Sequence, residues 1–174
     1  MVIAASTFIE GPAPTVGLLS FLIAMLQSKS TGSVRLKSAD PHARPQVDLG
    51  FLQHPEDMET LRKAIFLSTR IAAQVAKTGY LMKAYDVPAS DSPGDVDSFI
   101  RSKVATVYHY ASTCKMGKRE LGGVVDDQLR VYGVKGLRVC DASVFPCVTT
   151  AHTMAPVMAM AERCADLIKQ TQKY

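Results

Sequence analysis

The chain has 174 residues, of which 47% are hydrophobic and 21% are charged. This composition is sufficient for one compact domain with a hydrophobic core, and it argues against a disordered tail. The formal net charge of +4 comes from 20 basic and 16 acidic side chains that are scattered without long runs, so the sequence lacks a concentrated phosphate-binding stripe and argues against nucleic-acid binding.

The amino-terminal part contains an apolar run at residues 16–26. This run is too short for a membrane span, which needs roughly 20 apolar residues. It is preceded by Glu10 and two prolines rather than by a basic region, so we expect neither a membrane anchor nor a signal peptide. A buried helix or a segment that faces a partner fits the run better.

The next stretch has the alternation that is typical of strands. Apolar and basic residues alternate over residues 34–37, which predicts a half-buried strand. The chain then turns at Asp40-Pro41 and resumes as a second short extended piece at residues 47–49.

The spacing of apolar residues then becomes helical. It predicts a helix from Pro55 to about Val75 that begins with acidic residues and ends near Gly79. The expected buried face of this helix comprises Met58, Leu61, Ile65, Ser68 and Ala72. After a loop rich in Pro, Asp and Ser, a short amphipathic helix is predicted around Val96 and Ile100.

The last third alternates short apolar segments with turns. The pattern predicts short strands, separated by acidic and glycine-containing turns, at residues 124–125, 129–131 and 137–140. A closing helix is predicted from about Pro156, because proline is tolerated in a first helical turn. Its expected apolar face comprises Met158, Ala161, Ala165 and Ile168.

Four cysteines occur without a C-x-x-C pair and without histidines at ligand spacing, which argues against a structural zinc site. Buried free thiols are the favoured interpretation, and a disulfide remains the alternative. These cysteines are Cys114, Cys140, Cys147 and Cys164.

Two histidines are the best candidates for chemistry. His109 and His152 each lie in a loop rich in Thr, Ser or Cys, where functional residues are common. The sequence contains no H-E-x-x-H, G-x-S-x-G or P-loop motif. Asp126-Asp127, His42 and His54 lie in polar turns and are expected to be solvated.

Several stretches together resemble one family. Near the carboxyl end these are "YHYASTCKMG", "GGVVDDQLRVYGVKGLRVCDASVFP" and "TTAHTMAPVMAMAERCADLI". They closely resemble the carboxyl-terminal signature of the glucose-methanol-choline (GMC) oxidoreductases, which are FAD-dependent enzymes. The earlier stretch "GSVRLKSADPHARPQVDLGFLQHPEDMETLRKAI" resembles the substrate-domain segment of the same family.

The resemblance implies oxidation of an alcohol, with hydride transfer to flavin and no metal. It places His109 at the position of the catalytic histidine and His152 at that of the second active-site residue. A base must take the hydroxyl proton, and imidazole, whose pKa lies near neutrality, suits this role. We therefore expect His109 to be the base and His152 to hold the substrate oxygen or share the proton, although the two roles can be exchanged.

The resemblance also implies contacts with FAD. Asp141 and Ala142 would contact its ribityl-pyrophosphate region, and the loop formed by His152, Thr153 and Met154 would pass beside the isoalloxazine ring. The positive end of the closing helix would stabilise negative charge on the reduced flavin, and Thr153 is expected to cap that helix.

Two departures from the family pattern stand out. Ser112 occupies the usual glycine position after His109, which puts the backbone there in question if a positive φ is needed. No G-x-G-x-x-G follows a strand, so the dinucleotide-binding part of the family is not recognisable.

The expected fold is therefore α+β, as a fragment of a larger two-domain fold. Residues 1–105 would form part of a substrate-binding domain, with an antiparallel sheet backed by helices, and residues 106–174 the catalytic-histidine segment and the carboxyl-terminal part of an α/β FAD-binding domain. Exposed apolar surface would then meet a missing amino-terminal half or cause self-association. The alternatives are an FAD-containing lyase or cyclase that uses the histidines for acid-base chemistry, and an inactive truncated fragment.

Overall fold

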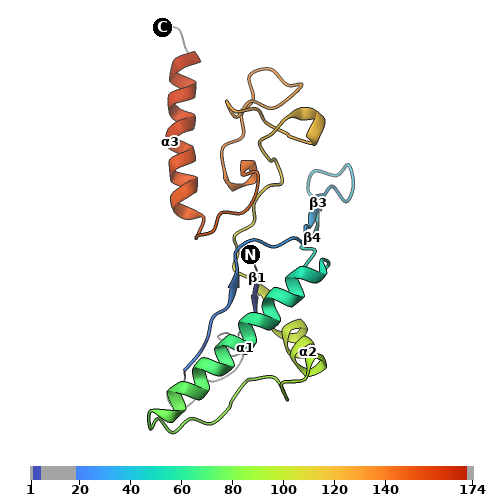
Figure 1. Cartoon of the computed structure of the whole chain (residues 1–174). Coiled ribbons are helices and arrows are strands. Elements are labelled where there is room, and N and C mark those ends of the chain that lie inside the picture. Colours follow the sequence, from blue (N-terminus) through green and yellow to red (C-terminus); the bar gives the residue numbers. More distant parts are fainter. Residues whose placement is uncertain (1, 5–18, 172–174) are drawn as a thin grey trace. The chain divides into compact units, whose positions relative to one another are not determined.

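The computed structural model describes residues 2–4 and 19–171 (Figure 1). The chain divides into two compact units. Unit 1 comprises Met1–Gly32 and Val47–Val107, and unit 2 comprises Ser33–Gln46 and Tyr108–Tyr174. Each unit has a hydrophobic core of its own.

Unit 1 contains a small antiparallel sheet. Its strands are β1 (Val2–Ala4), β2 (Ala24–Met25) and β5 (Val104–Thr106), in the order β2-β1-β5. In β1, Val2 lies opposite both Met25 and Thr106, so residues far apart in the sequence share one backbone ladder.

The apolar run at residues 16–26 does not form the expected buried helix in its described part. Residues 19–23 are irregular and lead into β2, because Ala24 and Met25 find their backbone partners on β1. Met25 is buried, whereas Leu19 and Leu22 are exposed. Residues 16–18 lie outside the described residues.

The first long helix, α1 (Pro55–Lys77), agrees with its predicted bounds to within two residues. It begins where the His54 imidazole accepts a hydrogen bond from the Glu56 N–H at 3.3 Å, and its first residue is a proline that has no N–H to satisfy. It ends where Gly79, at a φ of 96°, donates its N–H to the Ala76 carbonyl.

The second helix, α2 (Pro93–Lys103), confirms the predicted short amphipathic helix. The Ser92 hydroxyl caps it by accepting from the Asp95 N–H. Arg62 of α1 binds Asp97 of α2 through both carboxylate oxygens, at 2.5 and 2.6 Å. The core of unit 1 consists of Met25, Met58, Leu61, Ile65, Val96 and Ile100.

Unit 1 also holds a buried carboxylate. Asp57 is 2% exposed and accepts hydrogen bonds from the backbone N–H groups of Lys29 and Ser30, both at 2.8 Å. Burial raises the pKa of this carboxyl, but the hydrogen bonds from Lys29 and Ser30 lower it by more, so the pKa of Asp57 lies below its ordinary value.

The two predicted extended pieces form a hairpin of β3 (Ser33–Arg35) and β4 (Gln46–Asp48). The expectation that β3 is half-buried was wrong, because every residue of both strands is exposed. Val34 and Leu36 remain 47% and 87% exposed, since a hairpin buries a face only where another element covers it.

Unit 2 is mostly irregular. Its short helical turns are η1 (Arg119–Leu121) and η2 (Ala142–Val144), and its one described long helix is α3 (Met154–Thr171). The strands predicted between residues 124 and 140 shrink to single bridges. The chain reverses too often for a longer ladder, because Leu129 and the two glycines that follow it adopt positive φ angles.

Helix α3 begins two residues before the predicted start. It packs beside the irregular part of unit 2 (Figure 1) through Cys164, Leu167 and the partly buried Val157 and Met160. The predicted buried face was wrong, because Met158 and Ile168 on it are 62% and 39% exposed. The core of unit 2 consists of Val125, Leu129, Val144, Phe145, Cys164 and Leu167.

All four cysteines are free, as expected, but only Cys164 is fully buried and Cys147 is exposed. Burial, followed by the neighbouring Cys164 thiol, raises the pKa of Cys140 to about 11. Within residues 2–4 and 19–171, none of the helices combines the length and the hydrophobicity that a membrane span requires.

Candidate functional site

The segment that follows His109 is fixed by backbone hydrogen bonds. The N–H groups of Ser112, Cys114 and Met116 donate to the carbonyls of three consecutive residues, Ala142, Ser143 and Val144, at 3.3, 2.9 and 2.8 Å. This ladder joins the segment after His109 to η2 within unit 2, and it therefore holds the Asp141-Ala142 turn against the segment that carries the first candidate histidine.

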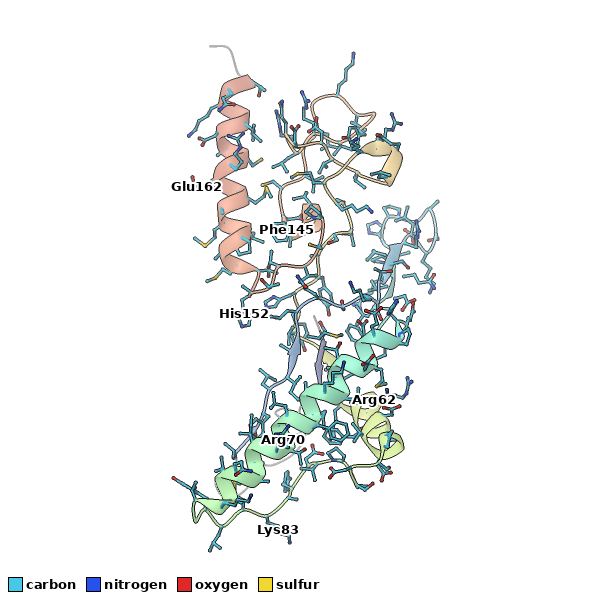
Figure 2. All side chains as sticks on the ribbon, viewed as in Figure 1. Arg62, Arg70, Lys83, Phe145, His152 and Glu162 are labelled. Carbon is cyan, nitrogen blue, oxygen red and sulfur yellow. The ribbon has the colours of Figure 1, made fainter. Side chains whose placement is uncertain are left out.

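The two candidate histidines meet. His109 Nε2 lies 2.6 Å from His152 Nδ1, although the two residues are 43 positions apart in the sequence. Their rings are in an edge-to-face arrangement, with centroids 4.9 Å apart and planes at 78°. Figure 2 shows His152 in the loop just before α3. The distance is that of a short hydrogen bond, so the rings can share a proton.

Thr153 joins the same constellation. Its hydroxyl lies 3.0 Å from His109 Nδ1, so both ring nitrogens of His109 have hydrogen-bond partners. We expected this hydroxyl to cap α3, but its recorded partner is His109. Pro156, at the third helical position, lacks an N–H that a cap could bind. The sequence indicated Thr153 through its place before a helix, but it did not reveal the contact with His109.

The other predicted cofactor residues lie in two places. The Asp141 carboxylate accepts the Ser143 N–H at 2.7 Å and so caps η2, whose first residue is Ala142. Met154 is the first residue of α3 and is 74% exposed. No hydrogen bond between Asp141 and the histidine pair is recorded in the described part of the chain.

Ser112 keeps the backbone conformation that suits glycine. Its φ is 73°, in the left-handed region, where a residue with a Cβ is strained by about 1–2 kcal/mol. Its hydroxyl is buried and has no hydrogen-bond partner among the described residues. Serine at this position therefore adds strain and an unpaired polar atom to the turn.

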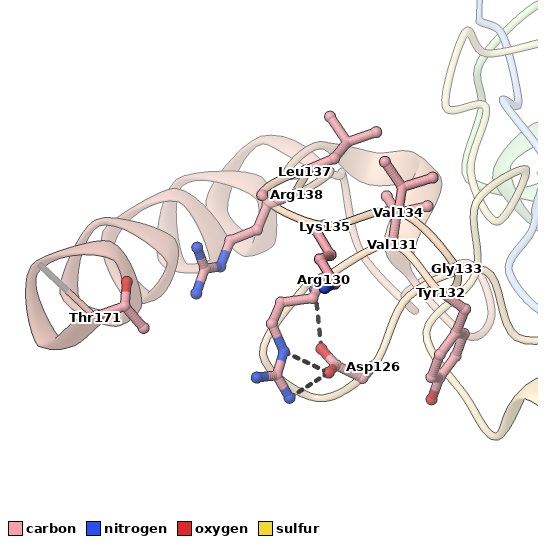
Figure 3. A pocket seen from close by; sticks show the side chains of 11 residues that line it. Asp126, Arg130, Val131, Tyr132, Gly133, Val134, Lys135, Leu137, Arg138 and Thr171 are labelled. Carbon is pink, nitrogen blue, oxygen red and sulfur yellow. Dashed lines mark hydrogen bonds and ion pairs between the residues drawn. The ribbon is translucent and has the colours of Figure 1, made fainter.

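Unit 2 also has a surface pocket, and none of the candidate site residues lines it (Figure 3). It is formed by residues 130–138, Asp126 and Thr171, and includes neither histidine. Asp126 binds the Arg130 guanidinium at 2.7 Å and accepts two backbone N–H groups. Burial raises the pKa of Asp126, but the bonds from Arg130 and Gln128 lower it by more. Asp126 thus stabilises its own turn.

The described residues also contain no cluster of three or more His, Cys, Asp or Glu side chains that could hold a metal ion. The candidate site therefore consists of two imidazoles and a hydroxyl, beside backbone N–H groups at the start of α3. Such a set can accept, share and donate protons.

The chain is similar in sequence and in fold to known proteins. Residues 28–161 match the GMC oxidoreductase family. The oxygen-dependent choline dehydrogenase of Chromohalobacter salexigens is 37% identical over 148 residues, which cover 84% of this chain and 26% of that protein. Its counterpart in Rhizobium etli is 40% identical over 145 residues, which cover 81% of this chain and 26% of that protein.

Solved structures give the same result. Pyridoxine 4-oxidase from "Mesorbium loti" aligns with a TM-score of 0.83 at 30% identity, over 95% of this chain and 33% of that one. A formate oxidase from Aspergillus oryzae, whose structure concerns modification of its FAD, aligns with a TM-score of 0.84 at 30% identity, over 92% of this chain and 29% of that one.

These matches confirm the expected fold class, a mixed arrangement of helices and antiparallel sheet that corresponds to the carboxyl-terminal part of the GMC fold. The chain spans about a quarter of the length of the curated relatives, 26% in both cases. With more than half of its residues matched and its fold shared with solved family members, the chain belongs to the GMC oxidoreductase family.

Proposed function

We propose that this chain supplies the acid-base site of an FAD-dependent oxidoreductase that oxidises the CH–OH group of a small alcohol. The observation that carries the proposal is the 2.6 Å contact between His109 and His152. Two imidazoles that share a proton suit a reaction in which a hydroxyl proton must be removed and its oxygen held.

In this proposal each histidine has a distinct task. One imidazole takes the proton of the substrate hydroxyl, and the other orients the substrate oxygen or spreads the resulting positive charge. We expected His109 to be the base. Its two nitrogens, however, already contact His152 and Thr153, so the pair can also work with the roles exchanged.

FAD would supply the flavin ring that accepts the hydride. Two parts of unit 2, the start of α3 and the Asp141-Ala142 turn, have the chemistry to hold it. The free N–H groups at the start of α3, near Thr153 and Met154, favour negative charge. The turn of Asp141 and Ala142 offers a carboxylate that can accept hydrogen bonds from ribityl hydroxyls. The unpaired buried hydroxyl of Ser112 is a further polar atom in this part of the chain.

The proposal assigns different tasks to the two parts of the chain. Residues 1–105 would belong to the substrate-binding domain, and residues 106–174 would carry the catalytic histidines and close the FAD-binding domain. Choline is the first substrate to test, because the curated relatives are named choline dehydrogenases. The solved neighbours are named for pyridoxine and formate, so a panel of small alcohols should accompany choline.

The test is a visible absorption spectrum of the purified chain after incubation with excess FAD and desalting. We expect a retained yellow chromophore that is bleached when choline or another alcohol is added without oxygen. A colourless protein would contradict FAD binding by this chain. Retained flavin that no alcohol bleaches would contradict the oxidation and would favour acid-base chemistry alone.

A further inference from the structure

The surface pocket of unit 2 is built on a tight hairpin at residues 130–138. Two backbone hydrogen bonds, at 3.0 and 3.1 Å, flank Arg130 and Arg138 and make them a directly opposed antiparallel pair. The side chains of such a pair lie on the same face, with Cβ atoms roughly 4.5–5.5 Å apart. Figure 3 shows both guanidinium groups extending from the hairpin toward the side where Thr171 lies.

The two opposed arginines differ in their partners. Like charges that face one another across a ladder are unfavourable unless an anion compensates them. Arg130 has its own anion, because its guanidinium binds the Asp126 carboxylate at 2.7 Å, and the charge of Asp127 acts on it as well. Arg138 donates its Nε–H to the Gln128 carbonyl at 3.1 Å, and the described residues give it no ion pair. The charge of Arg138 is therefore left without an anion.

The turn of the same hairpin adds further donors. Lys135 is exposed in this turn, and no ion pair of its ammonium is recorded among residues 2–4 and 19–171. Gly133 and Gly136 on either side of it have φ angles of 79° and 74°. The described part of the chain records no acceptor for the backbone N–H groups of these three residues. Open N–H groups in turns with left-handed residues favour the binding of anions.

The remaining polar groups of the pocket are engaged. The Asp126 carboxylate is held by the hydrogen bonds of its own turn, and the Tyr132 hydroxyl donates to a backbone carbonyl at 3.0 Å. The Thr171 hydroxyl contacts carbonyls of its own helix. Val134 and Leu137 are half-exposed apolar walls of a pocket of about 530 Å³. The polar groups that remain open to a ligand are thus cations and N–H donors.

We propose that Lys135 and Arg138, together with the open N–H groups of the turn, form a binding site for a phosphate group. An ammonium, a guanidinium and backbone N–H groups offer donors from several directions, which suits a tetrahedral oxyanion. The inference does not depend on the proposed function, because the pocket lining includes neither histidine and not the Asp141-Ala142 turn.

A titration of the ¹⁵N-labelled full chain with inorganic phosphate tests this site without flavin or alcohol. Amide ¹H–¹⁵N spectra are recorded at constant ionic strength, with sodium chloride as the salt that phosphate replaces. We expect saturable shifts at Gly133, Lys135 and Gly136, and none at Asp141 or Ala142. Phenyl phosphate is the second probe. Tighter binding than inorganic phosphate would assign the site to an organic phosphate, and equal binding would assign it to the free ion.

Variants of exposed lysines separate the site from general charge. Lys135→Gln should weaken phosphate binding about fivefold, because one charge-assisted contact is lost. Lys135→Arg keeps the charge and should retain the affinity. Lys118→Gln removes an exposed lysine of the same unit outside the pocket and should have no effect.

Two results would overturn the phosphate site. The first is the absence of saturable shifts in the turn of the unmodified chain, and this result needs no variant to fold. The second is an undiminished affinity in Lys135→Gln with the rest of its amide spectrum unchanged. In that case the cationic side chains do not bind phosphate together with the turn.

Discussion

The two units stabilise their residues in different ways. Unit 1 relies on two capped helices whose contact is fixed by Arg62 and Asp97, and its core side chains come mainly from these helices. Unit 2 has one long helix in its described part, and the segment after His109 is held by backbone bonds to the Asp141–Val144 region. Among the described residues, positive φ angles at residues with side chains occur at Leu52 in unit 1 and at Tyr108, Ser112 and Leu129 in unit 2.

The difference shows that backbone strain is concentrated in the unit that carries the candidate site. A helix satisfies its own backbone, so most of its side chains are free to build a core. A pair of loop histidines has to be brought together by chain reversals and by hydrogen bonds between distant segments. Some residues in these reversals adopt strained backbone conformations. The predictions that follow separate the chemistry of unit 2 from the packing of unit 1.

The largest effect should come from the histidine pair. In the FAD-bound protein, His109→Ala should lower the rate of alcohol oxidation by about 100- to 10,000-fold, because a positioned acid-base group is lost. Stopped-flow measurement of flavin reduction would quantify it. The control is His42→Ala, which removes an exposed histidine of the same unit and should leave the rate unchanged. An unaltered rate in His109→Ala would exclude a role in proton transfer.

The core of unit 1 should give the next largest effect. Leu61 is fully buried between the helices, so Leu61→Ala should lower the free energy of unfolding by about 2–5 kcal/mol. Leu67→Ala, on the same helix but 56% exposed, should cost less than about 1 kcal/mol. Urea unfolding would measure both. Equal losses in the two variants would mean that the core of unit 1 is not packed as described.

The buried carboxylate of unit 1 should make stability depend on pH. At neutral pH, Asp57→Asn should cost about 1–3 kcal/mol, because two backbone N–H groups lose a charged acceptor. The pKa of Asp57 is lowered on folding, so its contribution is present above the unfolded value of about 3.9 and is lost as the pH falls through the lower folded value.

Urea unfolding of both proteins at neutral and acidic pH should therefore show a difference that shrinks below about pH 4. Asp91→Asn, at an exposed position in the loop before α2, should have little effect at any pH. A difference for Asp57→Asn that stays constant down to strongly acidic pH would contradict the lowered pKa.

The smallest effect concerns the strained turn of unit 2. Ser112→Gly should raise the free energy of unfolding by about 1 kcal/mol, because glycine adopts a φ of 73° without strain and the unpaired hydroxyl is removed. Ser112→Ala removes the hydroxyl but keeps the strain, so it should stabilise the protein less. Thermal unfolding of the chain would rank the three proteins. If the alanine variant equals or exceeds the glycine variant, strain at this position is unimportant.

The sequence predicted unit 1 better than unit 2 because helices carry local information. The start of α1 at a proline, its 3.6-residue periodicity and its end near Gly79 are all visible in the sequence, and all proved correct. Apolar residues occur on more than one side of α3, and only packing decides which side is buried, so Met158 was assigned to the core instead of Met160.

The candidate site was found by resemblance more than by pattern. Taken alone, His109 and His152 were two loop histidines, and their 2.6 Å contact depends on the path of the chain between them. No local pattern predicts that Leu129 turns the chain with a positive φ, or that the Thr153 hydroxyl contacts His109 rather than its own helix. These features arise from long-range packing.

The backbone ladder after His109 has a further consequence for how this segment can vary. Alternate residues, at positions 112, 114 and 116, donate to three consecutive carbonyls, so the contacts depend on residue spacing and not on side-chain identity. Replacing a side chain at residue 113 or 115 preserves that spacing. Inserting or deleting a single residue between His109 and Met116 moves donors out of register. The segment should thus tolerate substitutions far better than insertions or deletions.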